Sequence, residues 1–234
     1  MRVASLFLSV AFISGCSGLL DYIPPNIWDA RSTNNKVIEK PREATWNTHA
    51  PEIDNEAVAG YHKRAEQGDA SAQNSLGEMY KNGQGVSQDY KKAVAWYRKA
   101  AEQGDANAQN NLGVMYKNGY GVPQDYKEAI AWYRRAAEQA NASAQNDLGG
   151  MYKNGQGVPP SRVVAYALYN LSAANDPSSA NIATGHRTYL AGNMTAQEID
   201  AAQNLTREMA RHNNLLTALD NYIRHPSVQE QFKQ

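Results

Sequence analysis

The chain has 234 residues, enough for one ordinary domain or one short repeat array. Lys and Arg together number 23, as do Asp and Glu, so the formal net charge is zero and gives no sign of the clustered basic excess that nucleic-acid binding requires. Cys16 is the only cysteine, which excludes an internal disulfide.

The N-terminus has the layout of an exported lipoprotein. Arg2 precedes a short apolar run over 3–13, too short for a membrane span of about 20 residues, and this pattern predicts a secretory signal peptide over 1–15. The sequence Ile-Ser-Gly before Cys16 resembles the bacterial lipobox, and that resemblance implies lipidation of Cys16. In bacterial lipoproteins an Asp after the cysteine tends to retain the protein at the inner membrane, so the resemblance together with Ser17 implies the outer membrane. The alternative is that the lone cysteine is a small buried hydrophobe.

Residues 16–55 are predicted to be the lipidated cysteine and a tether, because Pro24-Pro25 and the polar segment 31–36 are incompatible with a long helix. This segment is nevertheless too apolar for an inert linker. Its large apolar residues are Leu19, Leu20, Tyr22, Ile23, Ile27, Trp28 and Trp46. Either part of the tether docks on the rest of the chain, or it awaits a partner.

An internal repeat follows the tether. Ala72-Gln73-Asn74 recurs at 108–110 and at 144–146, a period of 36 residues. Residues 72–107 and 108–143 are identical at 26 of 36 positions. A period of 20–50 residues is typical of solenoids, in which each unit buries its apolar face only against its neighbours.

Each unit is predicted to be a pair of helices, A and B. In the first unit, Ala72, Leu76 and Tyr80 lie on one face of helix A. A glycine-containing loop over 82–86 leads to Asp89, whose side chain is suited to capping helix B.

These residues resemble the Sel-1-like repeat, a relative of the tetratricopeptide repeat. The first unit carries its pattern as Ala72, Leu76, Gly77, Tyr80, Gly83, Gly85, Val86, Asp89, Lys92, Ala93, Trp96, Tyr97, Lys99, Ala100 and Ala101. The resemblance covers about 57–210, with 57–68 matching a helix B that no helix A precedes. It implies an all-α fold, a right-handed α/α superhelical solenoid with repeats over 56–178.

The third unit and the residues after it depart from the pattern. Ala140 replaces the turn glycine Gly104, so that turn is predicted to be strained or rearranged around Asn141. Helix B of this unit gains apolar residues, namely Val163, Val164, Tyr166 and Leu168, which implies that something covers it. We expect the cover to be a C-terminal cap over 179–234. It has a capping box at Thr195 and Glu198, a short helix over 214–224 and frayed final residues.

The sequence offers little catalytic or metal chemistry. The G-x-G stretches at 83–85, 119–121 and 155–157 lack the preceding strand and the Lys-Ser/Thr of phosphate loops, and their recurrence makes them inter-helix turns. The five His have no ligand spacing on one helix. Some secreted members of the family are labelled β-lactamases, but the Ser-x-x-Lys of that class is missing. We therefore predict no catalytic residue, no metal and no cofactor.

A protein-binding groove is the remaining candidate site. By analogy with tetratricopeptide arrays, helix A lines the concave side. The predicted groove residues are Asn74, Glu78, Lys81, Asn110, Val114, Lys117, Asn146, Gly150 and Lys153. In one interpretation each Lys offsets the dipole of helix A and the groove is unused. In the other, the Asn and Lys ladders bind an acidic or carbonyl-rich partner segment.

The resemblance implies a protein-binding role with no nucleic-acid partner. The first hypothesis is a lipid-anchored scaffold or adaptor of the cell envelope, on the periplasmic side of the outer membrane. The alternative is an immunity protein that neutralises a phospholipase-type toxin effector of contact-dependent (type VI) secretion, as similar lipid-anchored members of the family do. A secreted hydrolase is a third hypothesis, for which no catalytic groups are found.

Overall fold

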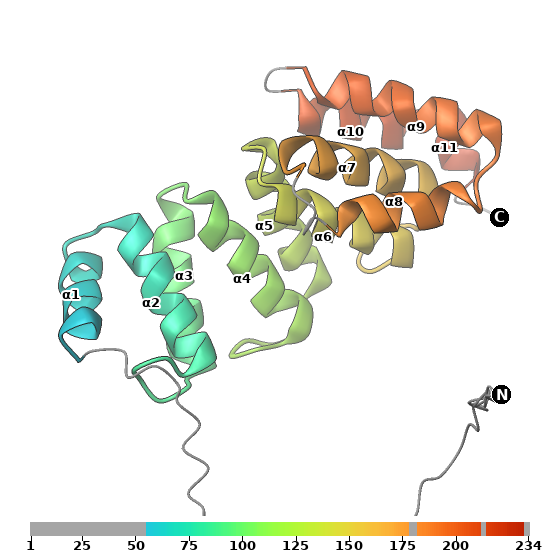
Figure 1. Cartoon of the computed structure of the whole chain (residues 1–234). Coiled ribbons are helices and arrows are strands. Elements are labelled where there is room, and N and C mark those ends of the chain that lie inside the picture. Colours follow the sequence, from blue (N-terminus) through green and yellow to red (C-terminus); the bar gives the residue numbers. More distant parts are fainter. Residues whose placement is uncertain (1–54, 178–181, 212–213, 232–234) are drawn as a thin grey trace, which may run out of the picture. The chain divides into compact units, whose positions relative to one another are not determined.

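The computed structural model describes residues 55–177, 182–211 and 214–231 (Figure 1). These residues form eleven helices and no strand. The predicted signal peptide, Cys16 and the tether lie outside the described residues.

Six helices of similar length form the three predicted units. The A helices are α2 (Ala70–Asn82), α4 (Ala106–Asn118) and α6 (Ala142–Asn154). The B helices are α3 (Tyr90–Glu102), α5 (Tyr126–Glu138) and α7 (Arg162–Asn175). Helix α1 (Asn55–Glu66) packs on α2 as the predicted leading helix B. The all-α, right-handed α/α superhelical solenoid expected from the repeats is confirmed.

Short polar side chains begin these helices. Asp69 Oδ1 accepts a hydrogen bond from the Ala72 backbone N–H at 3.0 Å, and Asp89 caps α3 in the same way. Ser161 caps α7, in the position that Asp89 has before α3. The A helices end at Gly83, Gly119 and Gly155, each with a φ near 70° that glycine adopts without strain.

A glycine–tyrosine contact holds the two helices of each unit together. Gly77 faces the ring of Tyr97 so closely that a Cβ on the glycine would lie 2.6 Å from ring carbons. Gly113 and Tyr133 repeat the contact at 2.6 Å, and Gly149 and Tyr169 at 2.8 Å. All three tyrosine side chains are fully buried. The missing side chain therefore sets the distance between helices A and B.

A buried glutamine joins each unit to the next. Gln109 Nε2 donates to the Ala101 carbonyl at 3.1 Å, and Gln109 Oε1 accepts from Gln139 Nε2 at 2.9 Å. Gln73 and Gln145 make the corresponding pairs of bonds. Each glutamine thus links its own helix A to the helix B of the preceding unit and to the C-terminal end of helix B in its own unit.

The turn at Ala140 keeps the positive φ and the backbone hydrogen bonds of its glycine counterpart Gly104. Ala140 has φ 59°, the only positive φ of a non-glycine residue in the described ranges. Asn141 still caps α6 by accepting from the Ala144 N–H at 2.9 Å. The strained form of the predicted alternatives is therefore the one adopted, at a cost of about 1 kcal/mol.

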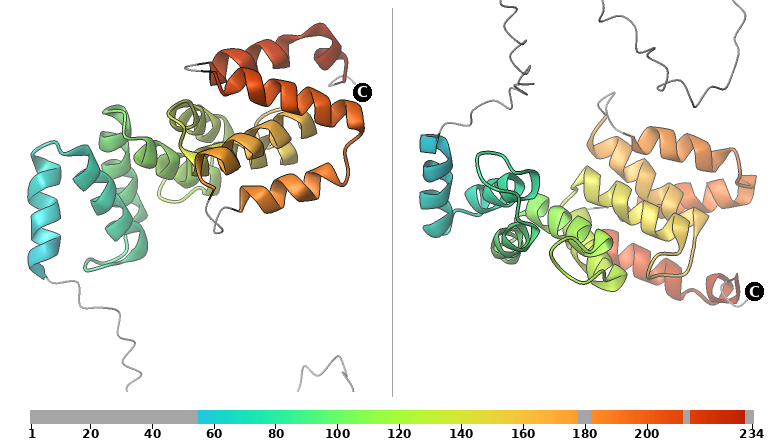
Figure 2. Two further views of the ribbon diagram at one scale, coloured as in Figure 1. Left: turned by 45° about the horizontal axis from the view of Figure 1, so that its top comes forward. Right: turned by 90° about the horizontal axis from the view of Figure 1, so that it is seen from below.

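Four helices follow the repeats: α8 (Ala183–Ala191), α9 (Ala196–Met209), α10 (Leu215–Arg224) and α11 (Pro226–Gln231). Helix α9 begins with the predicted capping box and packs on α7 (Figures 1 and 2), and the added apolar side chains of α7 are buried in one core with residues of α9. Helix α10 packs on α9 and reaches back to α5. There, Arg134 and Asp220 form an ion pair at 2.6 Å.

One C-terminal feature differs from expectation. The final residues are not simply frayed, because α11 begins at Pro226 and buries Val228; proline suits the first turn of a helix. Helix α8 holds Gly185 in the repeat register, but Gly185 is exposed and nothing lies within 4 Å of where its Cβ would be. Across the described ranges, no helix combines the length and apolar character needed to cross a membrane.

The glycine–tyrosine contact predicts the effect of adding one methyl group. Gly113→Ala should lower the free energy of unfolding by about 1–3 kcal/mol, because the Tyr133 ring is buried and cannot retreat. Gly185→Ala is the matched control and should be neutral or stabilising, since its surroundings are open and alanine favours helix. Urea unfolding of both variants measures this, and equal effects would contradict the proposed close contact.

Candidate functional site

The predicted groove residues lie on α2, α4 and α6, and we call the positions that hold them the A-helix face. The side chains at Asn74, Asn110 and Asn146 are half-buried, as are the three predicted lysines Lys81, Lys117 and Lys153. Glu78 is exposed, whereas Val114 and Gly150 are half-buried. The repeat position held by these last three residues thus varies in solvent exposure as well as in residue type.

Neighbouring A helices are linked by polar contacts at a position that the sequence analysis did not single out. Asn111 Nδ2 donates to Asn74 Oδ1 at 3.0 Å and to Glu78 Oε1 at 3.3 Å. In the repeat register, Asn111 corresponds to Ser75 and Asp147. Because this residue type changes from unit to unit, periodicity alone could not mark it as a link.

The lysines do not form a uniform ladder of free charges. Lys117 Nζ lies 3.8 Å from Asp147 Oδ1 on the next A helix. Lys153 Nζ lies 5.6 Å from the ring centroid of Tyr189 on α8. The positive charge expected along this face is therefore partly neutralised between units 2 and 3.

Asp147 is the electrostatic centre of this part of the face. Burial raises the pKa of Asp147, and the nearby charges of Lys117 and His186 oppose that rise. Burial, together with the charge of Asp147, also raises the pKa of Tyr169 to about 12 and that of Tyr133 further. The Tyr133 hydroxyl is buried and has no hydrogen-bond partner among the described residues, and the same is true of Asn110 Oδ1.

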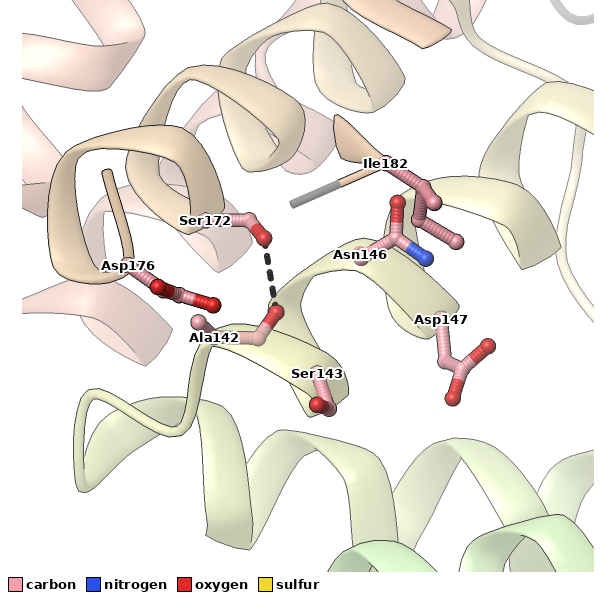
Figure 3. Close-up of a pocket in the computed structure, with 7 residues that line it drawn as sticks. All are labelled: Ala142, Ser143, Asn146, Asp147, Ser172, Asp176 and Ile182. Atoms are coloured by element: carbon pink, nitrogen blue, oxygen red, sulfur yellow. Dashed lines mark hydrogen bonds between the residues drawn. The ribbon is translucent and has the colours of Figure 1, made fainter. Parts of the chain in front are cut away.

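A cavity of about 290 Å³ opens beside Asp147, between α6, the end of α7 and the start of α8 (Figure 3). It is lined by Ala142, Ser143, Asn146, Asp147, Ser172, Asp176 and Ile182. The Ser172 hydroxyl donates to the Ala142 carbonyl at 2.7 Å and closes one side. Asn146 Oδ1 lies 2.9 Å from His186 Nδ1 on α8. The cavity offers carboxylate and amide oxygens, which suit a polar or cationic side chain of a partner.

Metal chemistry has no visible support in this region. Within the described ranges, no three His, Cys, Asp or Glu side chains come close enough together to hold a metal ion. The A-helix face can therefore contribute hydrogen bonds, charge and shape.

A family model for the Sel1 repeat matches residues 70–105, 106–141 and 142–177, which are the three helix pairs α2–α3, α4–α5 and α6–α7. The chain belongs to the Sel1-like repeat family. A protective antigen present in uropathogenic Escherichia coli strains, which displays an SLR fold, is 28% identical to this Sel1-like chain over 72% of it and 43% of the antigen, with a TM-score of 0.52. The chain thus spans less than half of that protein.

A Sel1 repeat protein from Oxalobacter formigenes is 37% identical over 56% of this chain and 97% of that protein, with a TM-score of 0.49. A comparison with curated proteins found no match. The resemblance read from the sequence is confirmed by the three family matches. Sel1 repeats form scaffolds that are suited to protein–protein interaction and are generally non-catalytic.

The raised pKa of Asp147 predicts a pH-dependent gain from Asp147→Asn, which installs the residue type of Asn111. The folded chain holds the Asp147 proton more tightly than the unfolded chain, whose pKa is near the usual 3.8. Wild-type stability should therefore fall relative to the variant as pH rises from about that value through the raised one, and the difference should then level off.

Urea unfolding of both chains at a series of pH values measures this difference. Asp200→Asn, at an exposed position of α9, is the matched control. A wild-type advantage at neutral pH would show that the ion pair with Lys117 outweighs the burial of the carboxylate.

Proposed function

We propose that this chain is a lipid-anchored adaptor of the bacterial cell envelope, on the periplasmic side of the outer membrane, and that it binds a protein partner through the A-helix face. The observation that carries the proposal is the A-helix face of the Sel1 array, with its inter-unit polar contacts and the cavity beside Asp147. The signal-peptide pattern and the lipobox-like sequence before Cys16 support the location.

The C-terminal helices favour this face over the B-helix side of the array. Helices α9 and α10 already occupy α7 and part of α5, whereas the A helices α2, α4 and α6 hold the predicted groove residues at exposed and half-buried positions. Asn110 is half-buried and its Oδ1 has no hydrogen-bond partner among the described residues, so in the proposed complex the side chain turns outward and accepts a hydrogen bond from the bound chain.

The partner chemistry follows from the charges in place. Asp147 neutralises the positive charge of Lys117, so the boundary of units 2 and 3 presents mainly oxygen acceptors. Lys81 adds positive charge at unit 1. We therefore propose a partner segment that places hydrogen-bond donors or a cation near Asn110 and Asp147 and acidic or carbonyl groups near Lys81.

Lipidation of Cys16 is tested in cells of a double-membrane bacterium. A fatty-acid analogue should label the full chain, and Cys16→Ser should abolish the label, because the thiol is the atom that carries the lipid. The wild-type chain should fractionate with the outer membrane. Equal labelling of Cys16→Ser would refute lipidation of Cys16 and would have no bearing on the proposal that the A-helix face binds a partner.

The binding face is tested by capture from envelope extract and from the products of neighbouring genes. The bait is the soluble chain from Ser17 onward, compared with a Lys81→Glu, Asn110→Ala variant. Among the described residues neither side chain forms a hydrogen bond or an ion pair, so the fold should persist. The control, Lys91→Glu with Lys127→Glu, makes charge reversals at exposed positions of the B helices.

We expect at least about tenfold less capture by the A-helix variant and unchanged capture by the control. Several envelope proteins captured in this way would match the adaptor. Capture of one tight partner of phospholipase type would favour the immunity role over the adaptor role, with the A-helix face still the binding surface. Equal capture by all three baits would reject the A-helix face.

A further inference from the structure

The two ends of the array are half-units of opposite kind. Helix α1 is a helix B that no described helix A precedes, and α8 takes the place of a helix A that packs on the preceding helix B, α7, but has no following helix B packed on it in the same way. The chain does supply a helix after α8, but α9 makes its main contacts with α7 and α10. Each end therefore carries one side of an interface that is completed three times inside the array.

The repeat register places matching residues at these two ends. Inside the units, the glycine of helix A packs under the tyrosine 20 positions later, as in Gly77 with Tyr97. Continuing the 36-residue period in both directions gives Tyr61 on α1 and Gly185 on α8.

The sequence has neither expected counterpart at its register position. Position 41, where a glycine for Tyr61 would stand, holds proline, and position 205, where a tyrosine for Gly185 would stand, holds leucine. Leu205 is buried in the core against α7 and unavailable to α8.

Exposure at the two ends fits this pairing. Tyr61 is 37% exposed, whereas the three tyrosines in the same register inside the units are at most 1% exposed. Ile182 and Tyr189 are 62% and 67% exposed, and they flank Gly185 on one face of α8 at spacings of three and four residues. Tyr120 is the other large hydrophobic side chain exposed in the described ranges, and it stacks on Tyr90.

We infer that α8 of one copy of this chain binds α1 of a second copy, so that Tyr61 packs over Gly185 and completes a fourth unit between two molecules. The contact continues the interface already present between α2 and α3, α4 and α5, and α6 and α7. It is head-to-tail, so each added copy presents the same free end, and the assembly closes into a ring or extends as a filament. This inference does not depend on the proposed partner or anchor.

Cysteine cross-linking of the full chain tests the pairing. Full chains carrying Tyr61→Cys and Gly185→Cys are mixed and oxidised, and one cross-linked species of two chains should form only when both are present. The double variant should give a ladder of multimers. The parent chain identifies any band due to Cys16, and Tyr120→Cys with Gly185→Cys is the control for an exposed tyrosine elsewhere.

Sedimentation velocity of the uncross-linked chain provides a second readout. The weight-average sedimentation coefficient should rise with concentration, and Gly185→Gln should weaken the association about tenfold or more by filling the space for Tyr61. The monomer should stay folded, because nothing lies within 4 Å of the added Cβ. Cross-linking no greater than in the Tyr120 control, or unchanged association of Gly185→Gln, would overturn the inference, as would cross-linking of Gly185→Cys to a different protein.

Discussion

A buried amide at the start of each A helix fixes how the units stack. Gln73, Gln109 and Gln145 are at most 5% exposed, and each bonds to a carbonyl of the preceding helix B and to the amide side chain that ends its own helix B. A buried amide left unpaired costs about 1–3 kcal/mol. A unit that shifts along its neighbour would break these hydrogen bonds, and this cost opposes the shift. The glycine–tyrosine spacing within units and the polar contacts between A helices both rely on this fixed register.

Much of this architecture follows from the 36-residue period, which predicts the helix pairs, their caps, the glycine turns and the leading helix α1. Periodicity also shows that Gln73 recurs, but it cannot reveal the role of that residue, because its partners are Ala65 in α1 and Gln103 just after α3, 8 and 30 residues away. The role of Asp147 could not be predicted for the opposite reason, since the residue type at this repeat position changes from Ser75 to Asn111 to Asp147. The sequence predicts that α7 is covered. It does not predict that α9 packs on α7 and leaves α8 without a following helix, because both α8 and α9 contact α7 and the sequence does not show how they share its surface.

The A-helix face is less repetitive than its sequence. At the one position that varies most, Glu78 accepts a hydrogen bond from Asn111, Val114 packs against the C-terminal core, and Gly150 lies with its Cβ position 3.9 Å from the Tyr169 hydroxyl. Three units of nearly equal backbone thus present three different chemical environments in a fixed order. A partner that binds along this face is aligned in one direction and one register, a property that a simple lysine ladder would not provide.

The contacts between α10 and α5 make the two halves of the array unequal. Arg134 meets Asp220, and Glu138 accepts from the Leu216 N–H at 3.1 Å, across 86 and 78 residues of chain. A linear array opens unit by unit from whichever end is weaker, because each unit is held only by its neighbours. Here the C-terminal end is held to a helix a full unit back, whereas α1, the first described helix, makes its main contacts with α2 alone. Local unfolding should therefore begin at the N-terminal helices and proceed inward. Units 2 and 3 should unfold together with the C-terminal helices as one cooperative unit.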